Sequence, residues 1–137
     1  MGRILIMIEH LPESCKLVVM AVFALVLSSC GYDYKEILRV TNPDGAVDAV
    51  AIDLLTGATV ATPTKIYVGD KGFEIKGEPV FVADYVGGLT MAWHGDANLI
   101  VRVEKARVFS FANSIDVKTS TGVKKISIVL SVEKSYE

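Results

Sequence analysis

Apolar and polar residues alternate in short runs from residue 36 onward, and this period of two is the strongest constraint on the fold. In residues 124–133, four branched apolar residues occupy every second position: Ile126, Ile128, Leu130 and Val132. A strand places successive side chains on opposite faces, whereas a helix needs a period near 3.6, which no segment after residue 30 matches well. The pattern therefore predicts a domain built from strands.

Turn-forming residues separate these runs. The strongest turn is Asn42-Pro43-Asp44-Gly45, in which proline presets φ and glycine permits a positive φ at the exit. Strands are expected at residues 36–41, 47–55, 65–68, 80–85, 89–94, 98–104, 107–111 and 124–133. Their spacing predicts an all-β fold, as a single small antiparallel β-sandwich or partly open barrel, and we expect a signal helix before it.

The segment before the strands has a different character. An apolar run, residues 17–27, ends in Leu27-Ser28-Ser29-Cys30. The run is shorter than the roughly 20 residues that a membrane span needs, but it has the length of a signal-peptide core. Small residues before a cysteine suit a signal peptidase that cuts an extended backbone, and only a thiol accepts a diacylglycerol thioether. The tetrapeptide resembles the lipobox of bacterial lipoproteins, which implies cleavage between Ser29 and Cys30 and lipidation of Cys30.

Another interpretation is that Cys30 merely ends a buried apolar segment. The first sixteen residues are not basic, because Arg3 and Lys16 balance Glu9 and Glu13, whereas a signal peptide opens with a positive region. A start site assigned too far upstream would explain this. We take the lipoprotein interpretation, which divides the chain into a signal peptide (1–29), a lipidated tether (30–34) and an antiparallel β domain (35–137).

Removal of residues 1–29 leaves 108 residues with 12 basic and 14 acidic side chains. This length suffices for one modest domain, and a net charge of −2 argues against nucleic acid as a partner. Cys15 leaves with the signal and Cys30 carries the lipid, so the domain has no disulfide and depends on its core. Gly31 follows Cys30 where an aspartate favours the inner membrane in lipoproteins. We therefore expect a protein anchored on the periplasmic face, at the outer rather than the inner membrane.

No catalytic, cofactor-binding or metal-binding set of residues stands out. His94 is the only histidine after residue 29, and a zinc site or a catalytic triad needs more than one such group. We interpret it as a solvated residue at a hairpin end. Five aspartates near turns lack the ligand spacing of a calcium loop and are interpreted as turn caps: Asp44, Asp48, Asp70, Asp84 and Asp96. The Gly87-Gly88 pair is interpreted as a turn.

Four aromatic residues are predicted to belong to the core, with a binding groove as the alternative: Tyr67, Trp93, Phe109 and Phe111. The leading functional hypothesis is a lipid-anchored, non-enzymatic binding or accessory domain whose partners are the membrane and an envelope protein. One alternative is an inhibitor of an envelope-attacking hydrolase that uses the loop at residues 57–63. The other is a small periplasmic hydrolase with a pocket around Trp93 and His94.

Several short motifs together resemble an uncharacterised family of small bacterial lipoproteins, whose members show a Ser-Pro-Asp-Gly turn, a Gly-Ala-Thr segment and an Ala-Arg-Ile-Phe-like strand. The matching segments, within residues 40–111, are Asn42-Pro43-Asp44-Gly45, Gly57-Ala58-Thr59 and Ala106-Arg107-Val108-Phe109. This chain has Asn42 where the family has serine, and Thr56 where many relatives have cysteine. The resemblance implies the lipoprotein class and supplies no catalytic residue.

Overall fold

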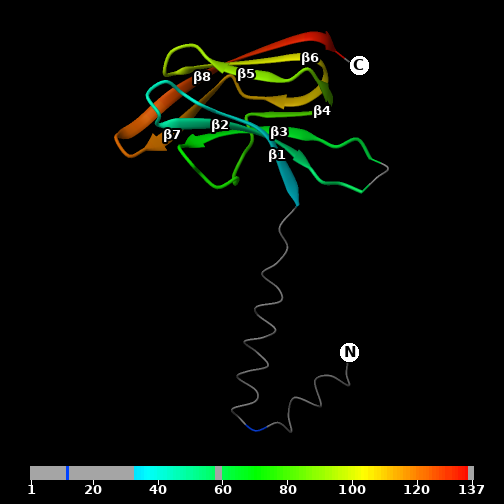
Figure 1. Cartoon of the computed structure of the whole chain (residues 1–137), viewed down its shortest axis with the longest axis horizontal. Helices are drawn as coiled ribbons and strands as arrows, with labels where there is room; N and C mark the ends of the chain where they lie inside the picture. Colours follow the sequence, from blue (N-terminus) through cyan, green and yellow to red (C-terminus); the bar gives the residue numbers. More distant parts are fainter. Residues whose placement is uncertain (1–11, 13–32, 58–59, 136–137) are drawn as a thin grey trace. The chain divides into compact units, whose positions relative to one another are not determined.

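Eight strands make up the part of the chain that the computed structural model describes, which comprises residues 12, 33–57 and 60–135 (Figure 1). The strands are β1 (Tyr34–Thr41), β2 (Val47–Leu54), β3 (Thr64–Asp70), β4 (Phe81–Gly87), β5 (Thr90–Trp93), β6 (Asn98–Phe111), β7 (Ser114–Thr119) and β8 (Gly122–Ser135). The all-β prediction is confirmed, and residues 33–57 and 60–135 contain no helix. The expected signal helix lies outside the described residues.

The strands form one open sheet in the order β1-β2-β3-β4-β6-β8-β7, with β5 also paired to β6. Neighbouring strands are antiparallel as expected, except that β6 and β8 run parallel, from Asn98 beside Ser127 to Ala106 beside Ser135. The parallel pair arises because the chain reverses twice after β6, and β7 then pairs with the far side of β8. Two strands expected at 98–104 and 107–111 are one long strand, and β7 is an additional one.

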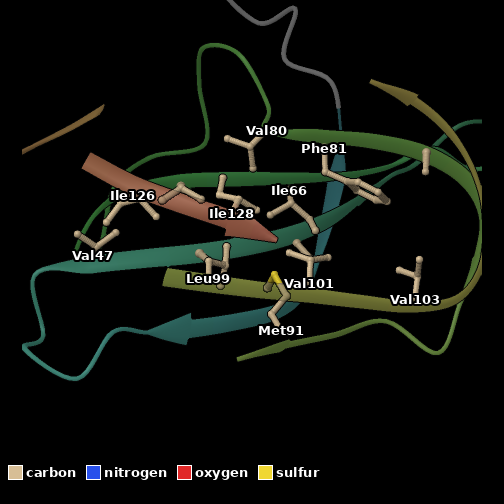
Figure 2. Close-up of a cluster of buried hydrophobic side chains, with 14 of the residues drawn as sticks. Val47, Ile66, Val80, Phe81, Met91, Leu99, Val101, Val103, Ile126 and Ile128 are labelled. Carbon is tan, nitrogen blue, oxygen red and sulfur yellow. The ribbon is translucent and has the colours of Figure 1, made fainter. Parts of the chain in front are cut away.

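Strand β6 curls back on itself and so folds the sheet into a partly open barrel. Its 14 residues would span about 45 Å if straight. Yet the residues just outside both ends reach the same place on β8, because Ser127 N donates to Ala97 O and Ile128 N donates to Asn113 O, each at 2.8 Å. Figure 2 shows the strand bending beyond Val103. The bend coincides with a change in alternation, since Val103 and Ala106 are both buried.

The concave side of this sheet encloses the main core (Figure 2). Its buried members come from the seven strands β2–β8 and from Val80, just before β4: Val47, Ala49, Ala51, Ile66, Val68, Val80, Phe81, Ala83, Met91, Leu99, Val101, Val103, Ala106, Val117, Ile126 and Ile128. A second, smaller cluster (Val50, Ile52 and Tyr67) lies on the other face of β2 and β3. Phe73 and Ile75 from the β3–β4 connection cover it. Strand β2 is therefore buried on both faces, which explains its nearly continuous run of apolar residues.

Hydrogen bonds between turns hold the open edges of the sheet together. The predicted turn at residues 42–45 is present, and the Asn42 side-chain amide donates to Asp96 O in the β5–β6 turn at 2.9 Å. Asp44 N donates to the Asp96 carboxylate at 2.9 Å, and Lys124 of β8 donates to the Asp44 carboxylate. Trp93 Nε1 donates to Val40 O at 3.1 Å, which ties β5 to β1. These contacts fix the relative positions of the first and last strands.

Candidate binding site

The predicted lipidation site Cys30 and the cleavage position Ser29 lie outside the described residues. Where the structure is described, no helix has the length and apolarity required to cross a membrane. Within the same residues, no three histidine, cysteine or acidic side chains converge as a metal site would require. The loop at residues 57–63 is described except for residues 58 and 59, and Val60 within it is exposed.

The predicted hairpin-end position of His94 is confirmed. Its side chain is exposed, and its backbone N–H donates to Asn98 O at 2.8 Å to close the β5–β6 turn. Trp93 is half-buried against the core, and its indole N–H is engaged by Val40 O. His94 therefore closes the β5–β6 turn through its backbone, and Trp93 packs its ring against the core.

The interpretation of five aspartates as turn caps is right for Asp44 and Asp96 and wrong for Asp48 and Asp84. Within the described residues, Asp70 joins its turn only through its backbone carbonyl, which accepts from Phe73 N at 3.0 Å. Asp44 and Asp96 both cap the turn at residues 42–45: Asp44 accepts from Ala46 N at 3.0 Å, and the Asp96 carboxylate accepts from Asp44 N at 2.9 Å. Asp48 and Asp84 are instead buried within strands, where each carboxylate is paired with an arginine. A buried carboxylate needs such a partner because leaving water is costly for a charge.

Asp48 is the centre of a polar network on the outer face of β1 and β2. Its carboxylate accepts from Thr41 Oγ1 at 2.6 Å, from Arg39 Nη1 at 2.9 Å and from Gly72 N at 3.0 Å. Burial alone raises the pKa of Asp48, but these three hydrogen bonds outweigh it and keep the pKa below its ordinary value. Arg39 also binds the Glu36 carboxylate through two hydrogen bonds of 2.9 Å. The hydrogen bonds of this network therefore run between its own members.

The bulge in β1 explains how Glu36 and Arg39 meet. Residues three apart on a regular strand face opposite sides. The register shifts between Glu36 and Leu38, so that Glu36 lies opposite Ile52 and Arg39 lies opposite Val50. Both then lie on the outer face with the smaller apolar cluster, and the Arg39 guanidinium is 5.9 Å from the centre of the Phe73 ring.

The second arginine–aspartate pair lies beside two exposed aromatic rings, and we take it as the candidate site. Arg107 of β6 lies opposite Asp84 of β4 and donates to it through Nε at 2.9 Å and through Nη2. The Arg107 guanidinium carbon is 5.3 Å from the centre of the Tyr85 ring and 5.2 Å from that of the Phe109 ring. We refer to Asp84, Tyr85, Arg107 and Phe109 as the Arg107 cluster.

Charge and aromatic contacts preorganise the Arg107 cluster. The hydrogen bond with Asp84 raises the pKa of Arg107, which stays charged. An arginine between two ring faces gains cation–π attraction on both, and the carboxylate below fixes its plane. The rings themselves remain open to solvent, with Tyr85 57% and Phe109 58% exposed. Such rigid, exposed aromatic surface is typical of the anchors of protein interfaces.

Tyr85, a member of the Arg107 cluster, has an unusual backbone conformation. Tyr85 has φ +51°, the only positive value among the described non-glycine residues. It lies in a bulge between Asp84 and Gly87, where the register of β4 against β6 shifts. A left-handed conformation costs about 1 kcal/mol or more for a residue with a side chain, and here it brings the Tyr85 ring to Arg107.

Beside the Arg107 cluster, one edge of β6 carries further apolar surface. Residues 107–111 pair with β4, but β8 pairs with β6 only as far as Ala106 within residues 33–57 and 60–135. Val108 and Phe111 are 38% and 39% exposed. The prediction that Phe109 and Phe111 belong to the core is therefore wrong, although it is right for Tyr67 and, in part, for Trp93. Arg107, two residues before Phe109 in the same alternation, was the signal in the sequence that this face of the strand is solvated.

A strand edge beside exposed aromatic rings can bind an extended polypeptide. The edge supplies main-chain hydrogen-bond groups to an added strand, and rings supply contact area for its side chains. Both oxygens of the Asp84 carboxylate accept hydrogen bonds from Arg107. Comparison of the chain with protein-family models, with curated protein sequences and with solved structures gave no match, so the site is interpreted from its own geometry.

Proposed function

We propose that this chain is a lipid-anchored binding protein of the bacterial envelope that captures an extended segment of a partner polypeptide along residues 107–111 of β6. The observation that carries the proposal is the juxtaposition of the Arg107 cluster with the exposed side chains of Val108, Phe109 and Phe111 on β6. A partner strand at this edge would extend the sheet, as in other β-strand additions. It would cover the exposed side chains of Val108, Phe109 and Phe111.

The site supports binding rather than chemistry. Its one cation is held by Asp84 and by two rings, and its one carboxylate is held by that cation. A catalytic acid or base must exchange a proton with a substrate and needs a free position for it. A binding surface needs the opposite property, namely fixed side chains whose order costs nothing at the moment of binding.

The anchor is part of the same proposal. The segment Leu27-Ser28-Ser29-Cys30 supports lipidation of Cys30, which would place the β domain at the periplasmic face of a membrane, outer rather than inner. The short tether, residues 30–34, would keep the binding edge close to other envelope proteins. Mass spectrometry of the mature N-terminus tests the anchor: we expect an acylated Cys30, and a Cys30→Ser variant that is unprocessed or soluble. A mature protein with residues 1–29 in place and no fatty acid would contradict it.

Photo-crosslinking in living cells tests the binding edge. A photoreactive residue replaces Phe109 or Phe111 in the full chain, and replaces Val129 of β8 in the control. Val129 is 55% exposed and Phe109 is 58% exposed, so the two positions sample solvent alike. We expect discrete protein adducts from positions 109 and 111 and none of the same mass from position 129. Adducts of the same pattern from all three positions would refute the edge as a specific site.

A further inference from the structure

One end of the β domain collects exposed apolar side chains next to the predicted tether. Ten large apolar side chains are exposed among the described residues, and four belong to the start of β1 or to the β2–β3 connection. Tyr34 is 45% exposed, Ile37 40%, Leu55 61% and Val60 67%. No partner chain has to be postulated for a single exposed leucine, but a group of this kind at one end of a domain marks a contact surface.

Backbone hydrogen bonds join the segments that carry these side chains. Tyr34 lies opposite Leu54 in the pairing of β1 with β2. Leu55 N donates to Asp33 O at 2.9 Å, and Leu54 N donates to Pro63 O at 3.1 Å, which closes the base of the β2–β3 connection. The first described residues of the domain, together with residues 55–57 and 60–63, therefore lie at one end, which we name the Tyr34–Leu55 end.

The length of the tether determines what this surface meets. Tyr34 is the fourth residue after Cys30, so three residues separate the two, and four residue steps of extended chain span at most about 14 Å. The headgroup layer of one leaflet is about 5–7 Å thick. A lipid on Cys30 would therefore hold the Tyr34–Leu55 end against the headgroups. We propose that this end docks on the bilayer that receives the Cys30 lipid, with its apolar side chains in the interface. The inference rests on the lipidation that the proposed function includes.

The chemistry of the Tyr34–Leu55 end suits a bilayer interface. Tyrosine is favoured at the headgroup level, where its ring is half apolar and its hydroxyl is hydrated. Two nearby carboxylates are already bound: Glu36 by Arg39, and Asp53 by Thr64 Oγ1 at 2.6 Å. The Arg39 guanidinium offsets the charge of Glu36 and so weakens its repulsion of lipid phosphates, whereas Asp53 keeps its charge. Burial of leucine, valine and tyrosine side chains in the interface adds to the hold of the lipid chains.

Tryptophan quenching in vesicles tests the inference with the full chain. The protein is produced in bacteria, purified from their membranes, checked for acylation of Cys30 by mass spectrometry, and reconstituted into phosphatidylcholine–phosphatidylglycerol vesicles with and without brominated lipids. Leu55→Trp adds a reporter at the Tyr34–Leu55 end, and Val129→Trp adds one at a control position of similar exposure. The wild type supplies the contribution of Trp93, the only tryptophan in the chain. A Tyr34→Trp variant provides a second reporter if Leu55→Trp alters the fold.

We expect brominated lipids to quench the added emission of Leu55→Trp and unlabelled vesicles to shift it to the blue, with no change for Val129→Trp. An acylated, vesicle-bound protein whose residue-55 and residue-34 reporters are both unquenched would overturn the docking and leave the anchor intact. Equal quenching at residues 55 and 129 would also overturn it, as would shielding of residue 55 by a second copy in detergent. A Cys30 without lipid would overturn the anchor and the docking together.

Discussion

Replacing Asp48 should show how much a buried carboxylate contributes to this fold. Its side chain is only 4% exposed and accepts three hydrogen bonds. Alanine removes all three acceptor contacts. Asparagine can keep an oxygen at the position of Oδ2, which receives both Arg39 and Gly72 N, and can donate from the position of Oδ1 to a reoriented Thr41 hydroxyl. The two substitutions therefore separate the hydrogen bonds from the charge.

The expected magnitudes follow from the environment of each donor. A hydrogen bond to a charged group contributes about 1.5–3 kcal/mol when its loss leaves a buried partner. Arg39 is 31% exposed and stays bound to Glu36 after the change. Solvent screening therefore reduces what its hydrogen bond to Asp48 contributes to stability. We expect about 3 kcal/mol of destabilisation for Asp48→Ala and about 1 kcal/mol for Asp48→Asn. In a domain of this size these values correspond to falls in Tm of about 12 °C and 4 °C.

Urea unfolding followed by Trp93 fluorescence and by circular dichroism measures both values. Thr41→Val is the matched control, because it removes one donor to Asp48 and leaves the carboxylate in place; we expect about 1 kcal/mol. The free-energy changes of Thr41→Val and Asp48→Ala should not add, because the two residues share one bond. Equal losses for Asp48→Ala and Asp48→Asn, or a loss below about 0.5 kcal/mol for the alanine, would refute the account.

Three further outcomes follow from the structure. Acidification should destabilise the domain, because the hydrogen bond from Arg39 lowers the pKa of Glu36 below its ordinary 4.5. The stability that Glu36 contributes is therefore present above pH 4.5 and is lost as the pH falls through the folded-state pKa. On acidification the urea midpoint should fall less in Glu36→Gln than in the wild type. Gly69→Ala should cost about 1–3 kcal/mol, because a Cβ there would lie 2.4 Å from Phe73 Cγ, whereas Gly57→Ala has no neighbour within 4 Å and should leave the urea midpoint unchanged. Phe109→Ala should change stability by no more than about 1 kcal/mol yet abolish the crosslinks formed from position 111; retention of those crosslinks would exclude Phe109 from the binding edge.

The local pattern of the sequence predicted most strands, because alternation and turn chemistry act over a few residues. The turn at residues 42–45 and the alternation of Met91 with its exposed neighbours are examples. Strand β7 carries the same signal in Ile115 and Val117, but the prediction did not include it. The break in alternation near residue 105 suggested two strands, whereas it is a bend within β6.

The alternation of apolar and polar residues could not predict which distant strands pair with each other. The parallel contact between β6 and β8 joins residues about 30 positions apart, and either direction would bury the same alternating residues. For the same reason, alternation could not show that Phe109 and Phe111 are exposed. The arginine partners of Asp48 and Asp84 likewise depend on registers that only the folded sheet defines.

The parallel pairing of β6 with β8 also bears on the order in which the domain folds. Long-range pairing slows folding, because a large loop must close before its contacts form. Ile126 and Ile128 belong to the core that β2, β3 and β4 begin to build. A chain emerging from a ribosome or a translocation channel therefore cannot complete its interior until residue 128 is free. Until then the apolar side chains in the first half of β6 remain exposed, and a chaperone that shields them would raise the yield of folded protein.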